Sequence, residues 1–195
     1  MKHHYQPGFF ATGLLWLLIA LLALPPSLLC AQSSPPVVVR QIVNDGSPQR
    51  SAVTNFALTF STNVAVTVSN LVLRNLATGT PIDPTNYALA YNPTNRQATY
   101  TFPGLPGRSL PQGNYIAALL ANTVADPAGQ RLDGNADGRP GDPYFFDLFR
   151  HFGDWNGDRD VDFWDNYWFQ STFGKTSTDT NYDARFDFNA DGGLG

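Results

Sequence analysis

Short runs of apolar and β-branched residues, separated by turn residues, dominate the chain from residue 37 to residue 120. Residues 99–102 alternate polar and apolar side chains, and a period of two is typical of a strand with one buried face. No helical period of useful length occurs in this region. The pattern predicts about seven strands in two antiparallel sheets, ending with an edge strand near residues 144–148. The runs that predict strands are VVVRQIV, AVTNFALTF, VAVTVSNLVLRN, NYALAY, QATYTF and NYIAALL.

The pattern changes after Asp147, where aspartates, glycines and aromatic residues replace the alternating runs. Residues 163–173, FWDNYWFQSTF, are long enough for three turns of helix. Their rings surround more of the helix than one packed face requires, so some should be exposed. One interpretation is a partner-binding surface; the alternative is rings left bare where a second helix would pack. The partner-binding candidates are Phe163, Trp164, Tyr167 and Trp168.

The N-terminus has the features of a secretory signal. A lysine and two histidines precede an apolar run at residues 14–24, and two prolines then lead to Cys30 and Ala31. The run is short for a transmembrane helix, so we expect cleavage after Ala31 and a mature chain without a membrane span. A lipidated Cys30 is the weaker alternative, because Leu29 stands where a small residue is expected. The sequence predicts a secreted, extracellular or cell-surface protein.

The acidic residues are concentrated in one part of the chain. All sixteen are Asp, and thirteen of them lie between Asp133 and Asp191, while the formal net charge is −4. No basic stripe is present, which argues against binding to nucleic acid or to anionic membranes. His151 is the sole imidazole after the signal, and neither a nucleophile motif nor an evident carboxylate pair accompanies it. The sequence therefore predicts a protein that is not an enzyme.

The segment DWNGDRDVDFWD, residues 154–165, crowds five carboxylates and an amide into twelve residues. Two unit charges about 4 Å apart repel by about 4 kcal/mol at an effective dielectric constant near 20, so a bound cation would relieve the loop. Oxygen donors at positions 1, 3, 5, 7, 9 and 12 are typical of calcium rather than zinc or copper. Arg159 departs from the glycine expected at position six, and position twelve has Asp in place of Glu. The candidate ligands are Asp154, Asn156, Asp158, Asp160, Asp162 and Asp165.

Two further segments begin with the same D-x-N-x-D spacing. The first site's spacing recurs 33 residues later, where Asp187, Asn189, Asp191 and the carbonyl of Gly193 are candidate ligands. The given sequence stops at position nine of that loop, so we expect the second site to bind weakly or not at all. The segment DGNADGRPGD, residues 133–142, has Pro at position eight and Tyr at position twelve. It is either a turn whose side chains bond their own backbone or a calcium site completed by Asp142.

These motifs resemble two known families. LPQGNYIAALLANTVADPAGQRLDGNADG resembles bacterial Ig-like domains over residues 36–148, which implies a spacer or binding module. DWNGDRDVDFWD is similar to the calcium loop of type I dockerins, and that likeness covers residues 149–195. The resemblance implies an EF-hand-like docking module that folds with Ca²⁺, binds a cohesin partner and often belongs to secreted polysaccharide-degrading enzymes. The family's partner-recognition positions are occupied here by Phe163 and Trp164 rather than by small or hydroxyl residues.

The sequence thus predicts a mainly β protein with three parts. Residues 1–31 are a signal peptide, residues 32–148 an Ig-like antiparallel β-sandwich, and residues 149–195 a small α-helical, dockerin-like module with an incomplete C-terminal end. The predicted function is non-catalytic: a calcium-folded tail attaches the Ig-like part to a cohesin-like or other extracellular protein. The alternative is a component of polysaccharide degradation, in which the sandwich binds or cuts glycan and the tail is an anchor.

Overall fold

The computed structural model describes residues 34–189 and 191–194. The predicted signal peptide lies outside these residues. Residues 35–195 belong to one compact unit. None of the helices in the described residues combines the length and the apolar character needed to cross a membrane.

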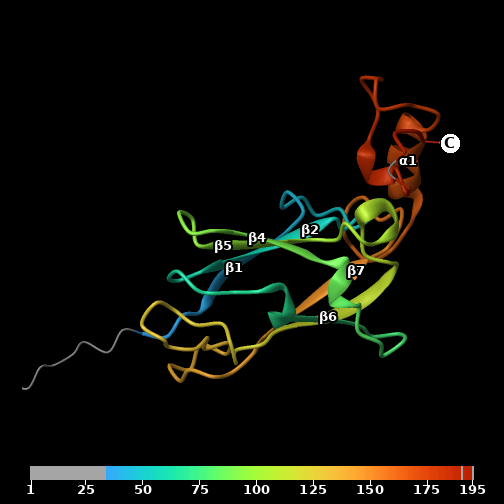
Figure 1. Ribbon diagram of the computed structural model, residues 1–195. Helices are drawn as coiled ribbons and strands as arrows, with labels where there is room; N and C mark the ends of the chain where they lie inside the picture. The colour runs from blue at the N-terminus through green and yellow to red at the C-terminus, as the bar shows by residue number, and fades with distance from the viewer. Residues whose placement is uncertain (1–33, 190, 195) are drawn as a thin grey trace, which may run out of the picture. The chain divides into compact units, whose positions relative to one another are not determined.

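The described chain is mainly β, with seven strands in two antiparallel sheets and one α-helix (Figure 1). The first sheet has four strands, in the spatial order β1 (Val38–Val43), β2 (Asn55–Phe60), β5 (Gln97–Thr101) and β4 (Ala88–Asn92). The second has three, in the order β3 (Leu71–Asn75), β6 (Gly113–Leu119) and β7 (Tyr144–Arg150). The predicted edge strand is confirmed, since β7 is the last strand of its sheet.

Each predicted run contains one strand, because period-two alternation matches the pleat of a half-buried strand. The run at residues 64–75 is strand only at its end. Its middle forms a single 3₁₀ turn, η1 (Val68–Asn70), because the Asn70 Oδ1 accepts hydrogen bonds from the backbone N–H and the hydroxyl of Thr67, at 2.7 and 2.9 Å. Local side-chain bonds of this kind compete with strand pairing. Three further 3₁₀ turns are η2 (Pro84–Asn86), η3 (Pro106–Arg108) and η4 (Ala184–Phe186).

The two sheets share one hydrophobic core. Phe56 of β2 stacks on Tyr100 of β5, with ring centroids 5.2 Å apart, and meets Phe146 of β7 edge-on at 5.2 Å. Because Phe56 and Phe146 belong to different sheets, their contact places the core between the two sheets. Burial of these large side chains supplies the main driving force for folding of this region.

The helix α1 (Phe163–Thr172) confirms the helix predicted at residues 163–173. It begins at Asp162, whose carboxylate accepts the Trp164 N–H at 2.8 Å, while Asp165 accepts the Asp162 N–H at 2.9 Å. This reciprocal capping box satisfies backbone donors that the first helical turn leaves free. The two acidic residues at positions nine and twelve of the DWNGDRDVDFWD segment therefore also start the helix.

Candidate metal-binding loops

Three loops of this chain, which we call loop A (residues 133–142), loop B (154–165) and loop C (187–193), share one backbone arrangement. In each loop the carboxylate at position one accepts the N–H of position six, and the residue at position six has a left-handed φ. The pairs are Asp133 with Gly138 (2.8 Å, φ 87°), Asp154 with Arg159 (3.1 Å, φ 78°) and Asp187 with Gly192 (2.8 Å, φ 86°). The repeated spacing therefore folds the same way three times.

The next positions of the three loops are also alike. The Asn at position three accepts the N–H of position five, and the Asp at position five accepts the N–H of position seven. The position-three bonds are Asn135 to Asp137, Asn156 to Asp158 and Asn189 to Asp191, and the position-five bonds are Asp137 to Arg139, Asp158 to Asp160 and Asp191 to Gly193. These local turns hold each chain segment in a tight curve, with the side-chain oxygens of positions one, three and five in place.

Arg159 occupies the position where the general calcium loop has glycine. Its left-handed φ is unfavourable for a residue with a Cβ, but contacts on both sides hold it there. Its guanidinium lies over the Phe149 ring, 4.3 Å from the centroid, and donates to the Asn114 Oδ1 at 3.3 Å. The Arg159 carbonyl lies 3.2 Å from Nδ1 of His151. The departure from glycine is therefore accommodated without loss of the turn.

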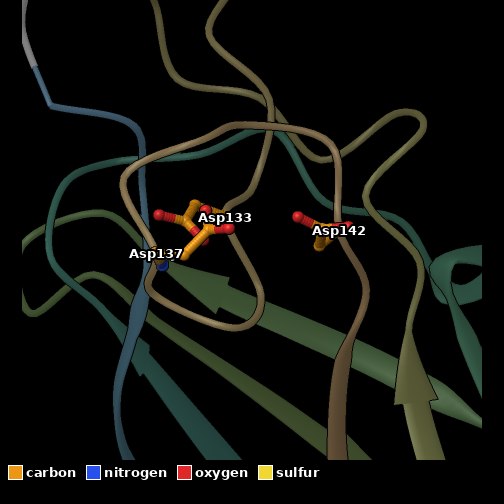
Figure 2. A group of neighbouring side chains, drawn as sticks. All are labelled: Asp133, Asp137 and Asp142. Carbon is orange, nitrogen blue, oxygen red and sulfur yellow. Dashed lines mark hydrogen bonds between the residues drawn. The ribbon is translucent and has the colours of Figure 1, made fainter.

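Loop A brings three carboxylates together (Figure 2). Asp133, Asp137 and Asp142 each place an oxygen within 4.8 Å of the others, and they are the one group of three or more His, Cys, Asp or Glu residues that converge in this way in the described chain. Asp133 and Asp137 lie together in Figure 2, with Asp142 facing them across the loop. A cation could be held at this point, because all three offer hard oxygen donors.

The return of Asp142 depends on close backbone packing at the base of loop A. The Gly134 N–H donates to the Asp142 carbonyl at 3.0 Å, and the Gly141 N–H donates to the Leu132 carbonyl at 2.7 Å. A Cβ on Gly134 would lie 2.2 Å from the carbonyl carbon of Pro143, so only glycine fits there. Both sequence interpretations of loop A have a structural counterpart, since its side chains bond their own backbone and Asp142 also faces Asp133.

Loop B places its first and last carboxylates in the interior. Asp154 is 0% exposed and Asp165 is 1% exposed, whereas Asp158, Asp160 and Asp162 face solvent. Asp154 accepts the N–H groups of Gly157 and Arg159, and Asp165 accepts those of Trp155 and Asp162. The structure thus brings together the two ends of the predicted ligand set, and its middle carboxylates remain on the surface.

The electrostatics of loop B follow from this burial. Burial raises the pKa of Asp154, with Asp165 and Asp158 adding repulsion, while two backbone N–H donors oppose the rise. The N–H of Asp160 and the amide of Asn156 lower the pKa of Asp158. The one ion pair in the described chain joins Arg185 to Asp183, so neither Asp154 nor Asp165 has a basic side chain at ion-pair distance. Two buried carboxylates without a cationic partner are costly unless a cation neutralises them.

Loop C is held against the segment that follows the helix. The Leu194 N–H donates to the Lys175 carbonyl at 2.9 Å, and the Ser177 N–H donates to the Gly192 carbonyl at 2.8 Å. The Tyr182 hydroxyl donates to Asp187, and burial together with this bond and nearby carboxylates raises the pKa of Tyr182 to about 12. Asp187 therefore already has a neutral hydrogen-bond donor at the oxygen that also accepts the Gly192 N–H.

The exposed rings predicted on the helix are confirmed. The exposed fractions are 69% for Phe163, 62% for Trp164, 55% for Tyr167 and 42% for Trp168. Trp168 also stacks on Trp155 of loop B, with centroids 4.6 Å apart and planes inclined by 15°. The four rings form a surface, which we call the aromatic face, and one of them is supported directly by the loop that precedes the helix.

Contacts between loop B and the β1–β2 connection were not predicted. The Arg50 N–H donates to the Asp154 carbonyl at 2.8 Å, and the Gly153 N–H donates to the Ser51 Oγ at 3.0 Å. These residues are about one hundred positions apart in sequence, and nothing in their local pattern marks them as neighbours. Only the glycine at position 157 was a signal, because an unneeded glycine inside a loop often marks a close backbone approach.

Comparison of the chain with models of protein families, with curated proteins and with solved structures finds no match.

Proposed function

We propose that this protein binds calcium through loop B and uses the helix that follows to contact an extracellular partner. In this proposal the strands form an Ig-like β-sandwich, and the C-terminal segment is a dockerin-like module of the EF-hand kind. The protein is a non-catalytic interaction protein, secreted or held at the cell surface. Its partner is a cohesin-like or other extracellular protein.

The observation that carries the proposal is the pair of buried, unpaired carboxylates at the two ends of loop B. Asp154 and Asp165 lie in the interior with only backbone N–H donors at hand, so a divalent cation would remove an unfavourable charge. Oxygen donors of Asn156 and Asp158 are already held in the turn by backbone bonds. This donor set suits calcium, and extracellular calcium modules work with dissociation constants of about 10⁻⁴ to 10⁻³ M.

The aromatic face supports the partner-binding part of the proposal. Large exposed rings grouped on one helix are common at protein interfaces, because each buries much apolar area with few rotatable bonds. Asp162 and Asp165, which cap the start of the helix, belong to loop B, and Trp168 stacks on Trp155 of the same loop. Ordering of loop B by a cation would therefore order the first turn of the helix and the rings on it.

Calorimetry tests the proposal. Titration of calcium into the chain from Gln32 onward should give a saturable heat, and EDTA should lower its melting temperature. Asp154→Ala combined with Asp158→Ala should abolish the heat assigned to loop B. The matched control is Asp83→Ala with Asp179→Ala, which removes two carboxylates that bond Thr85 and Thr176 in turns outside the three loops. Absence of a calcium heat in the unmodified chain would refute the proposal.

A further inference from the structure

Loop B is fastened to the strands by a set of contacts that we call the clamp. At its centre lies the peptide segment before β2: Arg50 N–H donates to the Asp154 carbonyl, His151 N–H donates to the Arg50 carbonyl, and Gly153 N–H donates to the Ser51 Oγ. Two of these bonds hold residues 153 and 154, at the point where loop B begins. The first ligand position of the loop is therefore held by residues of the β1–β2 connection as well as by its own turn.

Close backbone packing tightens the clamp at two glycines. A Cβ on Gly157 would lie 1.8 Å from the Pro48 carbonyl oxygen, and a Cβ on Gly107 would lie 2.4 Å from the Phe188 carbonyl oxygen. Both distances are shorter than any real Cβ contact, so the backbones meet directly at these points. Loop B touches the β1–β2 connection, and loop C touches the 3₁₀ turn η3.

Arg150, a buried residue, contacts both the β region and residues at loops B and C. It is 4% exposed, and its guanidinium donates to the carbonyls of Ser51 and Leu110, at 2.7 and 3.0 Å. Its guanidinium carbon also lies 5.8 Å from the centroid of the Phe152 ring and 5.2 Å from that of Phe188. Arg150 is the last residue of β7, so a buried cation at the end of a strand packs against the rings of Phe152 and Phe188, which also contact each other.

We propose that the β1–β2 connection positions loop B for cation binding, with Ser51 as the main positioning residue, and that a cation in loop B in turn stabilises the sheets. This inference rests on the proposed function, because it assigns an effect to the cation of loop B. It departs from a picture of two independent modules: the strands and loop B unfold together. Coupling free energies are reciprocal, so what the clamp does for cation affinity the cation does for the clamp.

Hydrogen exchange tests the effect on the sheets. The amides of β5 lie between β2 and β4, and no contact of the clamp involves them. If the strands and loop B unfold together, calcium at ten times its measured dissociation constant slows β5 exchange about tenfold. Unchanged β5 exchange, in a sample whose calcium heat is present, would overturn the inference and leave the proposed function intact. Absence of the heat itself would refute both.

A matched pair of serine variants tests the positioning role. Ser51→Ala removes the acceptor of the Gly153 N–H at 3.0 Å, and Ser109→Ala removes the acceptor of the Val53 N–H at 2.9 Å inside the β region. Both should lower stability to a similar extent. We expect Ser51→Ala to weaken calcium binding about fivefold, since one hydrogen bond orders the start of loop B, and Ser109→Ala to leave it within twofold.

The outcomes of the serine pair are separable. Calcium affinity unchanged from that of the unmodified chain in both variants would show that Ser51 has a structural role alone, and would overturn the positioning claim. Equal weakening in both would mean that affinity follows global stability, which would also overturn it. Should Ser51→Ala fail to fold, the exchange measurement on the unmodified chain decides the inference.

Discussion

Loops A and B share Asp, Asn and Asp at positions one, three and five and form the same turn, yet they use their remaining carboxylates differently. In loop A, Asp142 returns to face Asp133 and Asp137, and three carboxylates converge. In loop B, Asp162 and Asp165 turn toward backbone N–H groups and start the helix α1. The shared spacing determines the first seven positions, and the element that follows each loop decides what the later acids do.

The difference between loops A and B shows that a carboxylate in such a loop can have either of two roles. It can accept backbone hydrogen bonds, which stabilise the chain without any ion, or it can face other carboxylates, which destabilises the chain until an ion is bound. In loop A the later carboxylate faces other carboxylates, whereas in loop B the later carboxylates accept backbone hydrogen bonds. Loop B adds the clamp and a second buried carboxylate, while its Asp158, Asp160 and Asp162 stay at the surface.

Among the substitutions considered, Gly157→Ala should cause the largest loss in the free energy of unfolding. Gly157 has φ +79°, and an added Cβ would meet the Pro48 carbonyl oxygen at 1.8 Å. We expect a loss of about 3 kcal/mol in the free energy of unfolding, from overpacking and backbone strain. Gly174→Ala is the matched control, because its φ of +73° is similar but nothing lies within 4 Å; it should lose about 1 kcal/mol. Urea unfolding measures both, and equal losses would contradict the clamp.

Neutralising one late carboxylate in each loop should give effects of opposite sign in EDTA. Asp165→Asn leaves one of two backbone N–H groups without its acceptor, so we expect a loss of about 2 kcal/mol. Asp142→Asn removes repulsion from Asp133 and Asp137, so we expect a gain of about 1 kcal/mol at low salt that shrinks at high salt. Thermal or urea unfolding at two ionic strengths checks this; a loss in both variants would refute the distinction between the loops.

Truncation of two exposed rings tests whether the stacking of Trp168 on Trp155 stabilises the protein. Trp168→Ala removes the ring that stacks on Trp155, and we expect a loss of about 1 kcal/mol. Trp164→Ala removes a ring that is 62% exposed and whose ring neighbour is the exposed Phe163, and surface changes of that kind cost less than about 0.5 kcal/mol. The free energy of unfolding in urea measures both. Equal costs would mean that stacking on Trp155 contributes nothing to the loop.

The smallest expected effect is a difference in pH dependence. Burial, assisted by Asp165 and Asp158, raises the pKa of Asp154, so the native chain keeps this proton at pH values where the unfolded chain has released it. In EDTA, the stability of the unmodified chain relative to Asp154→Asn should therefore fall as pH rises from about 4. Urea unfolding between pH 4 and 7 tests the sign, and a relative stability that rises with pH would contradict the burial argument.

Much of the fold was predictable because local patterns carried it. The strands follow from period-two alternation, and the helix at residues 163–172 was predicted from the length of its segment. The capping role of Asp162 and Asp165 was not predicted, because both were assigned as metal ligands. The exception at η1 arose because the Asn70 side chain bonds Thr67, a local competition that alternation does not reveal. The D-x-N-x-D spacing predicted three candidate loops, and each has the same turn.

The sequence by itself determined the turns, because an Asp or Asn two to five residues before a free N–H needs no distant partner. Tertiary structure alone decided that Asp142 faces Asp133, and that Ser51 and Pro48 hold loop B. The contacts of Ser51 and Pro48 join residues about one hundred positions apart, so they depend on how the two sheets pack around their shared core. Asp133 and Asp142 are close in sequence, but their approach depends on the backbone bonds of Gly134 and Gly141 at the base of loop A. The local sequence thus determines the turns that hold the candidate ligands. The burial of these ligands and the contacts of loop B with the β1–β2 connection depend on the whole fold.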